Sequence, residues 1–219
     1  MTINELWTIG DVVEKEWKVV KILGGPRGPR RSGFGIVYVL HNLLNGSVDA
    51  AKTLQQLVEE NTEELKNKFR MEATIWNRLA GHPNIVEPRG VLDFVGLPFM
   101  MSEYIEEGDL SLPIRAGLFN DRLAEVCELG MQACDGLTFA QKHGVKAHLD
   151  IKPRNFLLRR GHLKICDFGL ARTLDGFELK TKGTGVSNDG LALMALPGGV
   201  VAGTLMYMAP EHRYTHQKK

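Results

Sequence analysis

Three side chains with complementary chemistry lie close together in the segment HLDIKPRN, residues 148–155. Asp150, Lys152 and Asn155 supply an acid, a cation and an amide within one short stretch. Groups of these types at this spacing can meet a hydroxyl, a phosphate and a metal ion. The segment DFG, which begins at Asp167, follows the apolar run LKIC further along the chain. The pattern predicts phosphate chemistry, to which other parts of the chain must contribute.

A glycine-rich segment lies between two expected strands in the first part of the chain. It contains Gly24, Gly25, Gly33 and Gly35, and Val37 follows it. Because glycine has no side chain, backbone N–H groups in such a segment can lie directly against phosphate oxygens. Taken alone, the segment fits a plain glycine hairpin better than a phosphate-binding loop.

Lys52 and Glu72 form a second candidate pair. Lys52 ends an expected strand and follows Ala50 and Ala51, which are small enough for a flat ring to pack nearby. Glu72 falls on the apolar face of an expected helix, where a carboxylate is costly unless it is paired, and Lys52 is its natural partner. Taken singly, Lys52 also fits a solvated charge at a sheet edge, and Glu72 fits a boundary residue that reaches solvent.

Hydrophobic periodicity indicates which elements position these residues. Alternating runs predict strands, the Asn45-Gly46 pair predicts a tight hairpin turn, and apolar spacings of three and four predict helices. Mostly strands precede residue 105 and mostly helix follows it, which suggests two lobes. The expected strands are 17–23, 36–44, 47–54, 91–95, 98–104, 156–158 and 163–166, and the expected helices are 58–79 and 122–143.

The two expected helices each carry one apolar stripe. In the first helix the stripe is formed by Leu65, Phe69, Glu72, Trp76 and Leu79. In the second helix, the residues expected toward one side are Leu123, Val126, Cys127, Met131, Cys134, Leu137 and Thr138. We expect the first stripe to face a core, whereas burying the faces of the second helix would require partners that this chain does not contain.

Composition excludes several classes of protein. With 219 residues the chain can form one large domain or two small ones, and a net charge of +1 gives no attraction to nucleic acid or anionic membranes. Three cysteines without a CxxC pattern argue against a disulfide framework and a structural zinc site, and they fit a reducing, cytoplasmic location. The first residues carry acids and lack the apolar core of a signal peptide.

One stretch, residues 191–210, carries no charge and is long enough to span a bilayer. Pro197, Gly198, Gly199 and Gly203 interrupt it, and no basic cluster flanks it closely. We therefore expect an apolar, glycine-rich loop that packs on protein, and we do not expect a membrane as a partner.

Taken together, these motifs resemble the catalytic domain of eukaryotic-type (Hanks-type) serine/threonine protein kinases. The family pattern is a glycine-rich loop, a strand lysine, a helix glutamate, a catalytic loop, DFG and APE, and all six occur here in that order between about Trp17 and Glu211. The resemblance implies an α+β, two-lobed kinase-like fold. Residues 1–105 would form an N-lobe with an antiparallel sheet and one helix, and residues 106–219 an incomplete helical C-lobe.

The resemblance also assigns roles to single residues. The family's catalytic positions match Asp150, Lys152, Lys52 and Glu72, with Asp150 as the base that orients the acceptor hydroxyl. The positions that bind the cofactor ATP match Gly25, Ser32, Gly33, Gly35, Val37, Ala50, Lys52, Glu103 and Leu157, and the Mg²⁺ ligands match Asn155 and Asp167. Within the adenine site, the backbone near Glu103 would meet the edge of the base. His148 and Phe168 match stacked core residues of the family.

The resemblance implies transfer of the γ-phosphoryl group of Mg·ATP to Ser or Thr hydroxyls of protein substrates. Lys152 soon after Asp150, and Thr204 after Gly203, are similar to serine/threonine kinases rather than tyrosine kinases. Two departures are local: the arginine-rich insertion at 26–31 stretches the glycine-rich loop, and Leu149 replaces an arginine that usually clamps an activation-loop phosphate.

The third departure is at the end of the chain. Lys219 follows Glu211 closely, before the helices that a full C-lobe contains, so we expect a truncated product, a fragment or a degenerate relative. The alternative function is a kinase-like module that binds nucleotide or a partner without turnover.

Overall fold

The computed structural model describes residues 6–24, 35–54, 57–58, 61–168, 172–173, 185–186, 192–196, 199–201 and 207. The chain divides into two compact units. Unit 1 comprises Met1–Ala80 and Glu87–Tyr104, and unit 2 comprises Gly81–Val86 and Ile105–Lys219.

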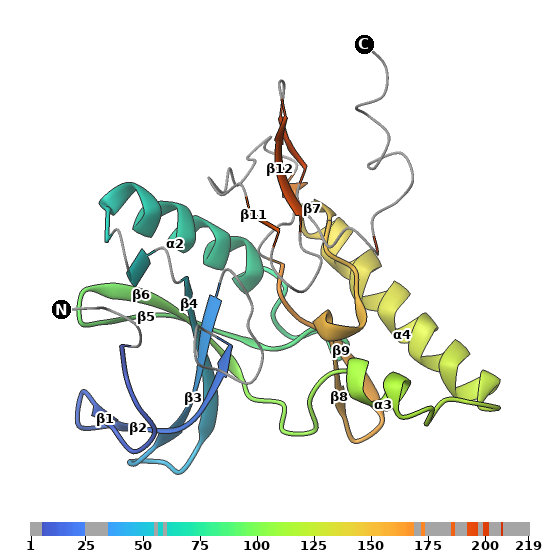
Figure 1. The fold of residues 1–219 in the computed structure, drawn as a ribbon, viewed down its shortest axis with the longest axis horizontal. Coiled ribbons are helices and arrows are strands. Elements are labelled where there is room, and N and C mark those ends of the chain that lie inside the picture. The colour runs from blue at the N-terminus through green and yellow to red at the C-terminus, as the bar shows by residue number, and fades with distance from the viewer. Residues whose placement is uncertain are drawn as a thin grey trace. The chain divides into compact units, whose positions relative to one another are not determined.

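Unit 1 is built on a six-stranded antiparallel sheet with the strand order β1-β2-β3-β4-β6-β5 (Figure 1). The chain forms a meander up to β4, and β6 then lies between β4 and β5. The strand that carries Lys52 therefore has a paired neighbour on each side. The bounds are β1 (Val12–Val13), β2 (Trp17–Gly24), β3 (Gly35–Asn42), β4 (Val48–Leu54), β5 (Pro88–Phe94) and β6 (Leu97–Glu103).

The hairpin predicted at Asn45-Gly46 is confirmed. It joins β3 to β4, with His41 paired to Val48. Gly46 has a φ of +74°, a conformation that glycine adopts without steric cost. The side-chain oxygen of Asn42 accepts hydrogen bonds from the backbone N–H groups of Leu44 and Asn45, at 2.8 and 3.1 Å, which fixes the start of the turn.

The register of this hairpin separates two faces of the sheet. Val37 pairs with Lys52, and Tyr38 pairs with Ala51, so the first pair shares one face and the second pair shares the other. On the Tyr38 face, the ring of Trp7 lies 4.9 Å from Tyr38 and stacks on Phe99 at 4.8 Å. Unit 1 thus has an aromatic core on one face, while the other face carries Lys52.

Helix α2 (Glu63–Asn77) is shorter than the helix predicted for residues 58–79. Its start is set by Thr62, which has extended backbone angles and whose hydroxyl accepts a hydrogen bond from Leu65 N at 3.4 Å. Asn61 lies in the left-handed region, with a φ of +46°, which interrupts the helical path. The predicted inner face is confirmed at Phe69 and Trp76, both of which are buried, and the helix packs against β5 and β6.

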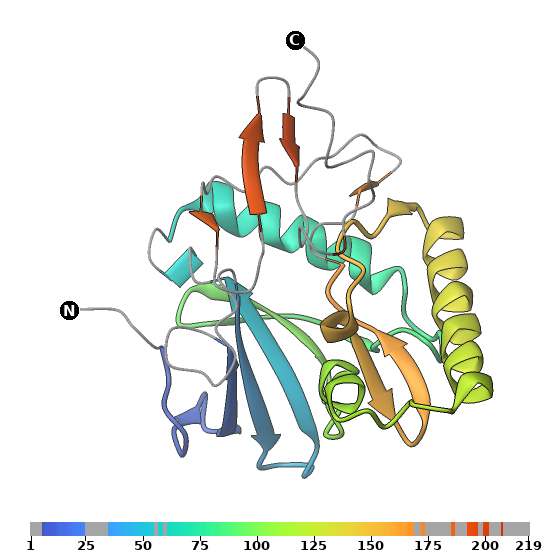
Figure 2. The same cartoon turned by 45° about the vertical axis from the view of Figure 1, so that its right-hand side comes forward.

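In unit 2, helix α4 packs against two strands, β7 and β9 (Figure 2). Gln132 of α4 accepts hydrogen bonds from Leu163 N at 2.7 Å and from the Asn84 side chain at 3.3 Å. Asn84 also donates to the carbonyl of Leu163 at 2.9 Å, so three segments are tied together by polar groups. The elements are α3 (Ser111–Arg115), α4 (Leu123–Lys142), β7 (Val145–Ala147), the 3-10 turn η1 (Pro153–Asn155), β8 (Phe156–Arg159) and β9 (His162–Ile165).

The apolar stripe predicted along one side of α4 is largely exposed. Leu123 is 75% exposed and Met131 is 62% exposed, and Val126, Cys127 and Cys134 are exposed as well. The residues that α4 buries are Leu129, Gly136 and Ala140. Two of these are small, which lets the helix approach its neighbours closely: a Cβ added to Gly136 would lie 2.9 Å from the Asn84 carbonyl oxygen. The buried side of α4 is therefore the side that allows close backbone approach, and not the side with the widest apolar stripe.

The described part of residues 191–210 contains strands, where a packed loop was expected. β12 (Ala192–Leu196) pairs antiparallel with β13 (Gly199–Val201), and β11 (Gly185–Val186) pairs with β12. Leu196 pairs directly with Gly199. β10 (Arg172–Thr173) pairs with β7. Within the described ranges, none of the helices has the length and apolar character needed to cross a bilayer.

Candidate active site

The segment between β7 and β8 holds Asp150 in a fixed setting. Lys152 Nζ lies 2.7 Å from Asp150 Oδ2. Asn155 Nδ2 donates to the backbone carbonyl of Asp150 at 2.7 Å and to its Oδ2 at 3.1 Å. Asp150 is 7% exposed, and Asn155 is also buried. The acid, cation and amide that the sequence singled out are therefore brought together in unit 2.

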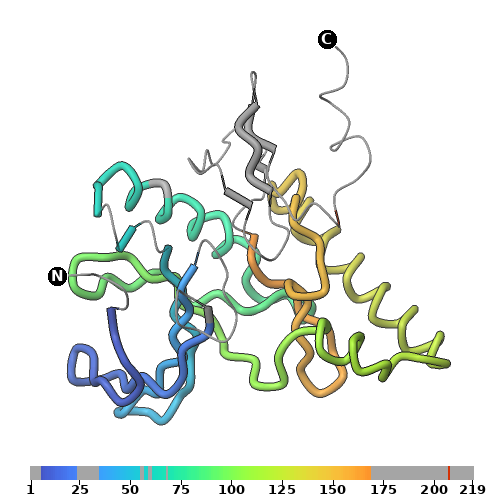
Figure 3. The backbone as a smooth tube through the Cα atoms, in the orientation of Figure 1, coloured from blue at the N-terminus to red at the C-terminus, as the bar shows by residue number. Residues whose placement is uncertain are grey.

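The turn η1 explains how Asn155 reaches back to Asp150. Pro153 begins the turn, and Asn155 N donates to the carbonyl of Lys152 at 2.9 Å. This tight turn reverses the chain between the acid and the amide. In Figure 3 the backbone can be followed from α4 through this loop to the orange strands β8 and β9.

Asp167 directly follows a residue that is hydrogen-bonded to Asn155. Cys166 N donates to the carbonyl of Asn155 at 2.9 Å, and Phe156 pairs with Ile165 at the same end of the β8–β9 hairpin. Asn155 and Asp167 thus lie at the same end of a hairpin, and oxygens of the kind that their side chains carry suit a hard cation. Among the described residues, no group of three or more His, Cys, Asp and Glu side chains could hold a metal ion by itself.

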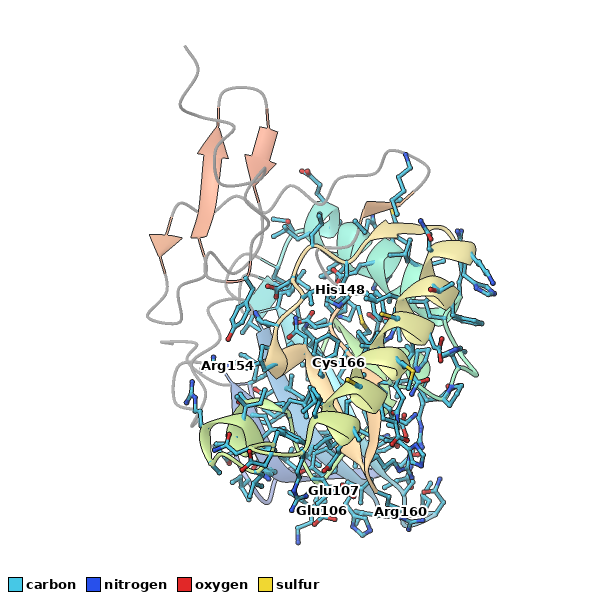
Figure 4. The ribbon with its side chains drawn as sticks, turned by 90° about the vertical axis from the view of Figure 1, so that its right-hand side faces the viewer. Glu106, Glu107, His148, Arg154, Arg160 and Cys166 are labelled. Atoms are coloured by element: carbon cyan, nitrogen blue, oxygen red, sulfur yellow. The ribbon has the colours of Figure 1, made fainter. Side chains whose placement is uncertain are left out.

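His148, which is labelled in Figure 4 with Cys166, is the first residue of the segment 148–155 and is buried. Asp150 N donates to His148 Nδ1 at 3.3 Å, and His148 Nε2 lies 3.1 Å from the carbonyl of Cys166, so Nε2 carries the hydrogen. Burial lowers the pKa of His148 below its ordinary value, against the opposing effect of the Cys166 carbonyl. Its ring lies 4.8 Å from that of Phe168. A neutral histidine therefore ties the Asp150 loop to the segment before Asp167.

Two residues next to this chemistry have left-handed backbone conformations. Leu149 has a φ of +64° and Asp167 a φ of +62°. For a bulky residue such as leucine this region costs roughly 1–2 kcal/mol. Strain of this kind persists only where the surroundings enforce it, and such residues cluster at functional sites.

The Lys52 side chain lies along β3 in unit 1. A Cβ added to Gly35 would be 3.2 Å from Lys52 Cε, which is tighter than ordinary contact. Val37 is the cross-strand partner of Lys52, and Ala50 precedes it on the same face of the sheet. Gly35, Val37, Ala50 and Lys52 are thereby gathered on one face, while Gly25, Ser32 and Gly33 lie outside the described residues.

Glu72 belongs to the same unit as Lys52. It is 9% exposed on α2, between the buried side chains of Phe69 and Trp76. A carboxylate in such a position needs a compensating partner. Its burial argues against the alternative of a boundary residue that reaches solvent.

The remaining predicted residues are held by backbone pairing. Leu157 of β8 forms a bridge with Asp109, and Leu158 N donates to the carbonyl of Gly108 at 2.9 Å. Glu103, the last residue of β6, is buried, and its carboxylate accepts a hydrogen bond from Glu87 N at 2.9 Å. This carboxylate contact was not predicted, although an acid at the end of the apolar run of β6 is an available signal. The APE segment, including Glu211, lies outside the described residues.

The sequence of the chain matches a known family over most of its length. Residues 31–218 match the family described as "Protein kinase domain". The chain belongs to this family. The order of the sequence motifs is the order expected for this family.

Several curated kinases are similar to this kinase domain. Serine/threonine-protein kinase SSK22 of Saccharomyces cerevisiae is 32% identical over 201 residues, which cover 91% of this chain and 14% of the relative. The probable serine/threonine-protein kinase pknA2 of Bifidobacterium longum is 29% identical over 204 residues, covering 91% of this chain and 24% of the relative. The chain thus spans less than a quarter of the length of these relatives.

Solved structures confirm the expected two-lobed kinase fold. The kinase domain of Mycobacterium tuberculosis PknI matches with a TM-score of 0.55 at 24% identity, covering 76% of this chain and 64% of that chain. A single-site mutant of the same domain gives a TM-score of 0.56 at 22% identity, covering 75% of this chain and 63% of that chain. At this identity the likeness concerns the fold alone.

Proposed function

We propose that this kinase domain transfers the γ-phosphoryl group of Mg·ATP to Ser or Thr hydroxyls of protein substrates. The observation that carries the proposal is the Asp150 loop, in which one carboxylate oxygen receives both Lys152 Nζ and Asn155 Nδ2. These two contacts fix the direction in which the carboxylate points. A preorganised carboxylate of this kind can orient a hydroxyl and accept its proton.

Other residues would stabilise developing charge, hold the phosphates and contact the base. Lys152, which is paired with Asp150 at 2.7 Å, supplies a positive charge beside the point where charge develops during transfer. Lys52 in unit 1 would hold phosphate oxygens, and the buried Glu72 would orient Lys52. Val37, Ala50 and Leu157 would contact the base. ATP itself supplies the transferred phosphoryl group and leaves as ADP.

The donor set fits Mg²⁺. Asn155 and Asp167 offer one amide and one carboxylate, linked through the 2.9 Å bond between Cys166 N and Asn155 O. Mg²⁺ is usually bound by one or two protein ligands together with water and phosphate oxygens, so two donors are sufficient when nucleotide is present. The close approach of Gly35 to Lys52 fits a segment where side chains are excluded.

The acceptor residue and the cellular compartment are inferred from single sequence features and from the names of the relatives. Lys152 after Asp150 supports Ser/Thr rather than Tyr acceptors, and the curated relatives carry serine/threonine kinase names. The three cysteines, Cys127, Cys134 and Cys166, are all free thiols, which supports a reducing, cytoplasmic location.

Calorimetric titration with ATP, with and without Mg²⁺, tests the nucleotide site. We expect Mg²⁺-dependent binding that weakens in Asp167→Asn, because a neutral amide is a poorer ligand for a hard cation. The exposed Asp135 provides the matched control, Asp135→Asn, which should bind as the wild type does. ATP affinity that is the same with and without Mg²⁺ would contradict the proposed metal site.

The alternative, a kinase-like module without turnover, is separated from the proposal by a second assay. Incubation with γ-labelled ATP and a mixed Ser/Thr peptide library should label peptides, and a Tyr-only library should stay unlabelled. Lys52→Met should remove the labelling, since loss of one such phosphate contact costs about 100-fold or more. Tight Mg·ATP binding without labelling of any peptide would favour the non-catalytic module.

A further inference from the structure

Glu87 and Glu103 lie where the chain passes between the two units. The chain leaves unit 2 after Val86 and enters unit 1 at Glu87, and it leaves unit 1 again after Tyr104. Both glutamates belong to unit 1, at the start of the segment that contains β5 and at the end of β6. They therefore mark the ends of the 87–104 segment, which carries the backbone expected to meet adenine.

Two hydrogen bonds join these residues reciprocally. Glu103 N donates to the backbone carbonyl of Glu87 at 3.0 Å. In return, Glu87 N donates to Glu103 Oε1 at 2.9 Å. The second bond uses a carboxylate as acceptor, which makes it stronger than a bond between two neutral groups. The Glu103 side chain thus closes a ring that fixes the backbone of both residues.

The Glu103 carboxylate lies close to a second acid. Its side chain is buried at 6% exposure, and its cross-strand partner on β4 is Asp49, a second buried acid. Like charges directly opposite each other destabilise a sheet. Arg89 of β5 reaches across β6 to pair with Asp49, which offsets part of this repulsion. A buried acid that needs an arginine nearby is poorly explained by packing alone.

We propose that the Glu103 carboxylate is a positioning residue, which holds the backbone of residues 103–104 in the conformation that receives the adenine edge of ATP. This inference rests on the proposed function, because it concerns the same nucleotide site. The carboxylate acts through the Glu87 N–H and does not touch the nucleotide. Its loss should therefore weaken nucleotide binding, while the chemistry of the Asp150 loop in unit 2 stays unchanged.

Affinity for Mg·ATP in Glu103 variants tests the proposal. Glu103→Ala removes the acceptor and should raise the Kd and the KM for ATP about 5- to 10-fold, with kcat within about 2-fold. Glu103→Gln keeps an acceptor oxygen at the same place and should stay within about 2-fold of the wild type. Glu106→Ala is the matched control, since it removes an exposed carboxylate a few residues away. Unchanged ATP affinity in Glu103→Ala would overturn the proposal.

Hydrogen exchange of the Glu87 amide gives a second readout that needs neither nucleotide nor activity. The amide should be protected in the wild type and in Glu103→Gln, and it should exchange faster in Glu103→Ala. Rapid exchange in the wild type would overturn the proposal even if the alanine variant fails to fold. If the amide is protected but the wild type binds no Mg·ATP, the proposed nucleotide site fails and the positioning role fails with it. If ATP binds equally well to all variants, the positioning role alone fails.

Discussion

Helices α2 and α4 carry similar apolar stripes and use them differently. On α2 the stripe that contains Phe69 and Trp76 is buried, as predicted. On α4 the corresponding stripe, from Leu123 to Met131, is exposed, and the helix instead buries Gly136 and Ala140. Periodicity therefore locates an apolar face but does not say whether that face is covered. A small residue can mark the packed side more reliably, because it permits close backbone approach.

Truncating one side chain from each stripe should have the largest effect on this comparison. Phe69→Ala should destabilise the protein by about 3–5 kcal/mol, because it removes a buried aromatic ring. Met131→Ala should change the free energy of unfolding by less than about 0.5 kcal/mol, because Met131 is exposed. Urea denaturation of both variants measures the difference. Equal losses would mean that the α4 stripe is covered in solution.

Two glycines of α4 allow a sharper test on one helix. A Cβ at Gly136 would lie 2.9 Å from both the Asn84 carbonyl oxygen and Ile165 Cδ1, whereas a Cβ at Gly130 meets nothing within 4 Å. Gly136→Ala should destabilise by about 1–2 kcal/mol, the cost of overpacking less the gain in helix propensity. Gly130→Ala should stabilise by roughly 0.5–1 kcal/mol. Thermal unfolding of the two variants measures these changes. A Gly136→Ala variant that is more stable than the wild type would contradict the packed side assigned to α4.

Low pH should lower the free energy of unfolding of unit 2 by less than the substitutions in α2 and α4 do. Burial lowers the pKa of His148, and it also lowers the pKa of His82, whose ring contacts Phe139 of α4. In the unfolded chain both titrate near the ordinary value of about 6.5, so below that pH the unfolded state binds more protons. Stability should therefore be fully present above about pH 6.5 and fall as the pH drops through the lowered folded values. Denaturation curves between pH 5 and 8 measure this loss.

The histidine variants identify the source of that pH dependence. His148→Asn should flatten the dependence of the free energy of unfolding on pH, whatever its effect at neutral pH, because it removes one of the two groups. A second variant, His82→Gln, should flatten it independently. Unaltered slopes in both variants would assign the acid sensitivity to other groups.

The sequence predicted the strands of unit 1 well because their signals are local. The Asn45-Gly46 turn and the alternating run before it required no knowledge of distant residues. The grouping of Asp150, Lys152 and Asn155 was also predictable, since these residues are close in the chain. The buried side of α4 was not, because it depends on Asn84 and Ile165, which the fold brings to Gly136 from far away. The bond from Glu87 N to Glu103 was missed for the same reason.

The helix start at Thr62 lies between these cases. Threonine before two glutamates is a typical cap, yet the apolar pattern continued upstream to Val58 and was given more weight. The left-handed conformation of Asn61 had a signal in residue type, because asparagine enters this region more readily than most other residues.

The rate of phosphoryl transfer in Asp150→Asn tests whether the Asp150 loop is the catalytic centre. The amide preserves shape and removes the charge that Lys152 and Asn155 hold in place. With a Ser/Thr peptide and saturating Mg·ATP, the transfer rate should fall at least about 100-fold while ATP affinity is retained. Asp135→Asn, on the exposed side of α4, should transfer at the wild-type rate. An Asp150→Asn variant that transfers phosphoryl groups as fast as the wild type would contradict the assignment of this loop as the catalytic centre.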